Sequence, residues 1–110
     1  MPRPAFLMLK SVKCEATEDT FGSDELYGLL GSHQFKVGSF VQGQASSLAL
    51  EALIPLGVAT LQVFERDIEL DDLLGEIDLP QEMEVERVVT LWASSARYMC
   101  WLQVSSQLEG

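Results

Sequence analysis

Acidic side chains are concentrated in two short segments of the chain. Residues 18–25 contain four of them and residues 65–72 contain five. Carboxylates this close together repel one another unless a cation or water screens them. Calcium, a hard cation, binds six to eight oxygen ligands, largely carboxylates and carbonyls. Each segment therefore indicates either a metal site or full exposure to water.

The segment 65–72 lies between two strand-like runs. In the run that follows it, Ile77 and Leu79 alternate with Glu76 and Asp78, which places apolar and acidic side chains on opposite faces. Asp and Glu are poor strand formers, so the acidic residues themselves are expected in a loop. The pattern predicts a strand, an acidic loop and a second strand, and residues 18–25 are flanked in the same way.

Each acidic segment contains a motif that resembles one family. These are the calcium-dependent lipid-binding modules named after the second conserved region of protein kinase C, here called C-two domains. The first metal loop of that family reads Asp, a few residues with Gly, and then Ser-Asp-Pro-Tyr. This chain matches it, in order, with Asp19, Gly22, Ser23, Asp24 and Tyr27.

The third metal loop of the family reads apolar-Asp-x-Asp, a spacer, and then Asp-apolar-apolar-Gly. Here the corresponding residues are Phe64-Glu65-Arg66-Asp67 and Asp72-Leu73-Leu74-Gly75. The chain departs from the family pattern in three ways: Glu65 stands where Asp is usual, Glu25-Leu26 replaces a single Pro, and both loops are shorter.

The resemblance implies that calcium is held between the loops at 18–24 and 65–72. The ligands that it implies are Asp19, Asp24, Glu65, Asp67 and Asp72, and Glu18 or Asp71 would take part if the shortened loops shift register. In the mechanism that the resemblance implies, cations neutralise the acidic loops, which lets an anionic phospholipid headgroup or an acidic partner protein approach. The alternative is a protein-interaction domain on the same scaffold that does not use calcium.

Three apolar residues, Phe21, Ile68 and Leu70, are interleaved with the carboxylates. A plain solvated loop would carry polar side chains at these positions. The apolar side chains either fold back beneath the loops or stand beside the metal, where they would enter a membrane or contact a partner protein.

The formal net charge of −10 results from 17 acidic residues against seven Lys and Arg. No basic stripe is available to bind a phosphate backbone, so nucleic acid is excluded as a partner. An acidic surface by itself also serves solubility. The clustering of the acidic residues, rather than their number, favours a metal site.

The alternation along the chain predicts an all-β protein, an antiparallel β-sandwich of about eight strands that forms one domain over residues 1–110. Residues 46–54 would also suit a short helix, and only the fold context favours a strand there. We expect a cytoplasmic protein, because no run reaches membrane-spanning length, and the resemblance implies that it can associate peripherally with a membrane. The predicted strands are 6–16, 26–30, 35–41 with a bulge at Gly38, 46–54, 58–65, 73–79, 87–92 and 97–104.

The only two cysteines, Cys14 and Cys100, lie in apolar alternations, which predicts buried free thiols, or a disulfide if the terminal strands are adjacent. The only histidine, His33, has no nucleophile placed with it by the sequence, so we do not expect an enzyme. The aromatic residues in strand patterns are expected to be buried or half-buried. They are Phe64, Trp92, Tyr98 and Trp101.

Overall fold

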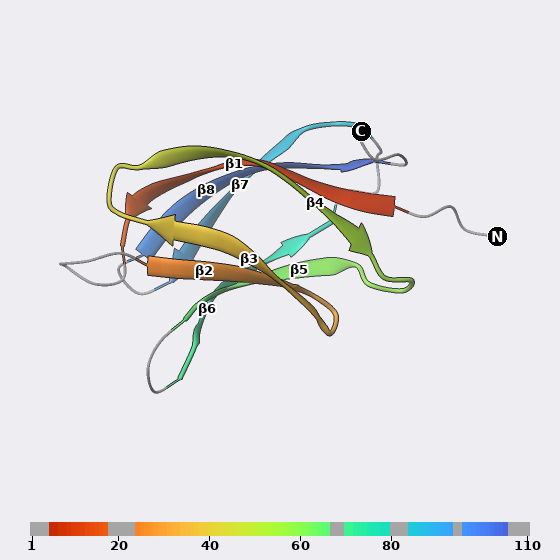
Figure 1. Ribbon diagram of the computed structural model, residues 1–110, viewed down its shortest axis with the longest axis horizontal. Helices are drawn as coiled ribbons and strands as arrows, with labels where there is room; N and C mark the ends of the chain where they lie inside the picture. The colour runs from red at the N-terminus through yellow and green to blue at the C-terminus, as the bar shows by residue number, and fades with distance from the viewer. Residues whose placement is uncertain (1–4, 18–23, 67–69, 80–83, 94–95, 106–110) are drawn as a thin grey trace.

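The structure is a computed structural model that describes residues 5–17, 24–66, 70–79, 84–93 and 96–105. These residues form eight strands in two four-stranded antiparallel sheets (Figure 1). The first sheet has the order β4-β1-β8-β7 and contains β1 (Ala5–Ala16), β4 (Ala45–Ile54), β7 (Arg87–Ala93) and β8 (Ala96–Ser105). The second has the order β3-β2-β5-β6 and contains β2 (Asp24–Leu30), β3 (His33–Phe40), β5 (Thr60–Glu65) and β6 (Asp72–Asp78).

The two sheets pack face to face, and alternate side chains of their strands form the core between them. In β1, Val12 and Cys14 are buried whereas Lys13 is exposed, and in β2, Leu26 and Leu30 are buried. This period of two confirms the predicted β-sandwich and all eight predicted strands. Burial of these apolar side chains is the main force that holds the sheets together.

Residues 46–54 form a strand rather than a helix. β4 pairs with β1 from Ala5 opposite Ile54 to Lys13 opposite Ala45. The Ala and Leu residues of β4 are extended because of this pairing. Their intrinsic preference for a helix is weak enough for tertiary contacts to override. The predicted bulge at Gly38 is also present, because the β2–β3 register shifts between Gly38 and Lys36.

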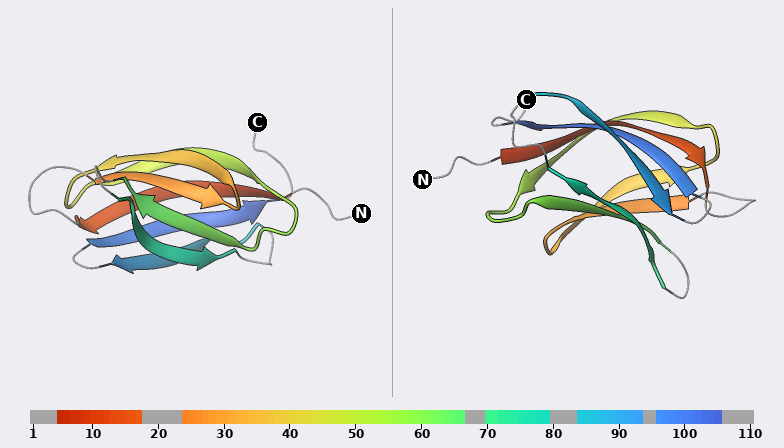
Figure 2. Two further views of the ribbon diagram at one scale, coloured as in Figure 1. Left: turned by 90° about the horizontal axis from the view of Figure 1, so that it is seen from below. Right: turned by 180° about the vertical axis from the view of Figure 1, so that it is seen from behind.

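At one end of the sandwich, which we call the loop end, β1, β3, β5 and β7 end and β2, β4, β6 and β8 begin. Figures 1 and 2 show this end opposite the beginning of β1 and the end of β8. The described parts of the two carboxylate-rich segments, residues 24–25, 65–66 and 70–72, therefore lie at the same end of the molecule.

The two cysteines are buried free thiols. β1 and β8 do lie side by side, but Cys14 is opposite Tyr98 and Cys100 is opposite Val12. The two strands are adjacent, as a disulfide would require, but the two cysteines are not opposite each other and do not form one.

The expectation for Trp92 was wrong. Tyr98 is buried and Phe64 and Trp101 are half-buried, as expected, but 67% of Trp92 is exposed. Trp92 belongs to β7, an edge strand of the first sheet, and shares the outer face with its partner Arg97. Alternation alone does not distinguish this outer face from the inner one.

Candidate functional site at the loop end

Asp24 is the first residue of β2 and lies between the two sheets. The sequence predicted it in a loop, but it pairs with Phe40 of β3 and is 0% exposed. Its Oδ2 accepts a hydrogen bond from the Tyr98 hydroxyl of β8. One predicted metal ligand therefore also connects the second sheet to the first at the loop end.

Tyr98 is held as a hydrogen-bond donor by its surroundings. Burial raises the pKa of its hydroxyl far above the usual range, and the hydrogen bond to the Asp24 carboxylate raises it further. Burial likewise raises the pKa of the Cys14 thiol, which forms a hydrogen bond with Tyr98. Both groups keep their protons at neutral pH, so the tyrosine oxygen does not add a charge beside Asp24.

Glu65 and Asp72 face each other across the ends of β5 and β6. Glu65 is only 4% exposed and pairs with Asp72 on one side and with Leu26 on the other. Because Leu26 points into the core, both carboxylates lie on the inner face of the second sheet. Asp24 precedes Leu26 by two residues and lies on the same face. The structure thus brings three predicted ligands to one face at the loop end.

The other predicted ligands and contacts lie outside the described residues, with two exceptions. Glu18, Asp19, Phe21, Asp67 and Ile68 fall in segments 18–23 and 67–69, which the structure does not describe. The two exceptions are Asp71 and Leu70.

The oxygen chemistry of Asp24, Glu65 and Asp72 fits a hard cation such as calcium. Within the described ranges, however, no group of three or more His, Cys, Asp or Glu side chains is arranged so that it could hold a metal ion. The described carboxylates alone therefore do not make a complete metal site.

Asp71 lies on the other face of the second sheet. Its Oδ2 accepts a hydrogen bond of 2.6 Å from the Tyr27 hydroxyl, and this bond raises the pKa of that hydroxyl. Tyr27 also stacks on Phe64, with ring centroids 5.3 Å apart. The guanidinium of Arg66 lies 4.8 Å from the centre of the Tyr27 ring. Tyr27 thereby fastens residues 66 and 71, on both sides of segment 67–69, to the sheet.

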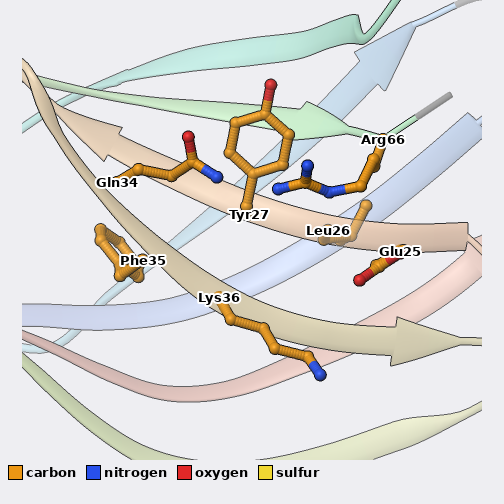
Figure 3. A pocket seen from close by; sticks show the side chains of 7 residues that line it. All are labelled: Glu25, Leu26, Tyr27, Gln34, Phe35, Lys36 and Arg66. Carbon is orange, nitrogen blue, oxygen red and sulfur yellow. The ribbon is translucent and has the colours of Figure 1, made fainter.

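An open pocket of about 180 Å³ lies on this outer face, at the bulge between β2 and β3. Figure 3 shows the Arg66 side chain directed toward the Tyr27 ring inside it. The pocket is lined by Glu25, Leu26, Tyr27, Gln34, Phe35, Lys36 and Arg66. Lys36 and Arg66 are cationic, so the outer face next to the loop end is less acidic than the inner face.

Large apolar side chains are exposed around the loop end. Leu70, which the sequence predicted as a contact residue, is 78% exposed. Val41 and Leu73 are 48% and 45% exposed, and Trp92 also lies there, at the end of β7. Sequence reasoning did not select these last three. The usable signal was their position, since each lies within two residues of a connection at the loop end.

No protein-family model matches the sequence, and no curated protein matches it. Solved structures do match the fold. One contains the two C-two domains, A and B, of extended-synaptotagmin 2, with a TM-score of 0.57 and 17% identity over 93% of this chain and 41% of that one. Another is the structure of a C-two domain, with a TM-score of 0.54 and 15% identity over 94% of this chain and 99% of that one.

The chain therefore has the fold of a C-two domain, as the two acidic motifs predicted. It spans less than half of the extended-synaptotagmin 2 structure, which contains two such domains. In the part of the chain that the structure describes, no helix is long and apolar enough to cross a membrane.

Proposed function

We propose that the protein is a calcium-regulated binding module whose loop end associates with a membrane surface. The observation that carries this proposal is the convergence of Asp24, Glu65 and Asp72 on one face at the loop end, with two of them almost fully withdrawn from water. Carboxylate oxygens are among the ligands that calcium prefers in proteins. The exposed apolar residues around the same end supply a surface for contact.

When bound, calcium would supply positive charge at this end of a strongly acidic domain. The residues of the chain hold the site in place. Tyr98 orients the Asp24 carboxylate, and pairing with β2 and β6 fixes Glu65. Tyr27 contacts the Asp71 carboxylate and the Arg66 guanidinium and so holds both residues against the second sheet. The carboxylates of Asp19 and Asp67 would complete the site, and Glu18 would take part if the shortened loops shift register.

One observation favours the second candidate, a protein-interaction domain that does not use calcium. The Oδ2 atom of Asp24 already accepts a hydrogen bond from Tyr98, so part of the carboxylate's bonding capacity is used within the protein. A carboxylate that is satisfied in this way can be structural. Two departures from the family pattern, Glu65 in place of Asp and the shorter loops, also favour the calcium-independent candidate.

Calcium should raise the melting temperature if the first proposal is correct, because the ligands are assembled only in the folded state. One site at one hundred times its dissociation constant adds about 2.7 kcal/mol to the free energy of unfolding. For a domain of this size that is a rise of about ten degrees. Differential scanning calorimetry in millimolar calcium and in excess chelator measures it.

The matched control is the double variant Asp67→Asn with Asp72→Asn. It should lose the calcium effect and keep the melting temperature of the chelated protein, or exceed it slightly, because two repelling charges are removed. Identical melting curves of the parent protein in calcium and chelator would establish the calcium-independent function instead. If the variant unfolds in chelator, these carboxylates are structural.

A further inference from the structure

Trp92 is the largest exposed apolar side chain among the described residues at the loop end, and one side of its ring contacts Arg97. The guanidinium of Arg97 lies 4.8 Å from the centre of the Trp92 ring. The same guanidinium is held by Glu15 of β1, with Nη2 and Oε2 2.7 Å apart. Arg97 thus links Trp92 to β8 and β1, so the ring is supported on one side and exposed on the other. The indole is a fixed feature of the outer face of the first sheet.

Val41, Leu70, Leu73 and Trp92 form a collar around the loop end. Val41 follows β3, Leu70 and Leu73 lie just before and at the start of β6, and Trp92 lies at the end of β7. Val41 is fixed by a turn, because its amide and carbonyl both bond to Gln44. Leu73 lies on the outer face of the second sheet, opposite Phe64, whereas Trp92 lies on the outer face of the first. The collar therefore includes both outer faces of the sandwich.

This arrangement favours a membrane over a protein as the occupant. A partner protein that packs on one outer face would leave either Trp92 or Leu73 uncovered. A bilayer that receives the sandwich end-on can meet both outer faces at the depth of its headgroups. Tryptophan is suited to that depth, because its ring is apolar, its N–H needs a polar partner, and it concentrates at the membrane–water interface.

Charge determines which bilayer surface fits. The described arginines nearest this end, Arg66 and Arg97, are already engaged with Tyr27 and with Trp92 and Glu15. The domain as a whole carries a formal charge of −10. Lys13 of β1 and Lys36 of β3 are the described lysines toward this end, and they are few against this acidic total, so apolar and aromatic contact has to provide the affinity.

We propose that Trp92 is an interfacial anchor that sits at the headgroup level of a phosphatidylcholine bilayer when the loop end is bound to it. The inference rests on the proposed function, because it assumes that the loop end meets a membrane. It adds a contact on the β7–β8 side of the molecule, outside both acidic motifs.

Two variants isolate the fluorescence of each tryptophan. Trp101→Phe leaves Trp92 as the only tryptophan, and Trp92→Phe leaves the half-buried Trp101. Each is mixed with phosphatidylcholine vesicles in calcium and in excess chelator, with and without bromine on the acyl chains. We expect a blue shift and bromine quenching for Trp92 in calcium, and neither for Trp101.

The affinity contribution is measured by vesicle sedimentation of Trp92→Ala against the matched control Val88→Ala. Val88 lies on the same strand and outer face, half-exposed, about 13 Å further from the loop end. We expect Trp92→Ala to weaken binding about tenfold, a shift of 1.4 kcal/mol, and the control to bind like the parent protein. Equal melting temperatures establish that both variants are folded.

The outcomes separate the two proposals. If the parent protein pellets with vesicles in calcium but the fluorescence of Trp92 stays unchanged, the anchor is disproved and the proposed function stands. If Trp92 is quenched equally in calcium and chelator, the anchor is supported and the calcium requirement fails. If the parent protein pellets with vesicles under neither condition, both proposals fail.

Discussion

Cys100 connects burial at a single residue with the stability of the whole protein. It lies in the core, and burial raises the pKa of its thiol to about 12. In the unfolded chain a thiol has a pKa of about 8.5. As the pH rises above that value, the unfolded state loses its proton while the folded state keeps it, so the free energy of unfolding falls until the folded thiol also ionises. Burial raises the pKa values of Cys14 and Tyr98 in the same direction.

The free energy of unfolding should therefore fall between pH 8 and pH 10, and Cys100→Ala should remove about 2 kcal/mol of that fall. Urea denaturation under reducing conditions at both pH values measures it. Met99→Ala is the control, because Met99 is the neighbouring residue on the opposite face of β8. If Cys100→Ala shows the same fall as the parent protein, the thiol is accessible to ionisation in the folded state.

At the scale of elements, the contact between β2 and β3 depends on a glycine. A Cβ atom at Gly28 would lie 2.5 Å from Cζ and 2.9 Å from Cε2 of Phe35, its partner in β3. The ring therefore lies directly across the β2 backbone and covers this part of the core. The close approach requires the absence of a side chain at position 28.

Gly28→Ala should lower the free energy of unfolding by about 1–3 kcal/mol, because the Phe35 ring has to leave its place. Phe35→Leu should relieve part of this cost, so the double variant should be more stable than the sum of the single effects predicts. Chemical denaturation of all four proteins gives the coupling energy. Additive effects would mean that the ring does not occupy this position in solution.

At the scale of the whole molecule, charge and apolar surface are separated. The carboxylates Asp24, Glu65 and Asp72 lie on the inner face at the loop end, and the apolar collar surrounds it on the outside. A contact made by the collar depends on burial rather than on attraction between exposed charges. Salt screens such charges over about 10 Å at 0.1 M and over shorter distances at higher concentrations.

Binding to phosphatidylcholine vesicles in calcium should therefore persist when salt is raised from 0.1 M to about 0.5 M. Sedimentation at fixed free calcium and increasing potassium chloride measures it. A protein bound to anionic vesicles through basic residues provides the comparison, since its binding falls steeply with salt. A comparable loss here would assign the contact to charged groups and remove the collar from the mechanism.

Local sequence patterns were sufficient to predict the strands and the two acidic motifs. Alternation with a period of two requires only neighbouring residues, and the ambiguous segment 46–54 was assigned from the order of the strands around it. The same reasoning predicted that the thiols of Cys14 and Cys100 are buried and free, which the structure confirms. The order of the two motifs along the chain indicated the C-two fold, which the solved structures confirm.

The positions of individual side chains were decided only by the tertiary structure. Asp71 and Asp72 are neighbours, yet one bonds to Tyr27 on the outer face while the other lies opposite Glu65 on the inner face. A shift of one residue in strand register exchanges the two faces, and sequence patterns do not determine register to that accuracy. Asp24 is buried because Tyr98, 74 positions later, reaches it from the other sheet. Trp92 is exposed because β7 is an edge strand whose outer face no other strand covers.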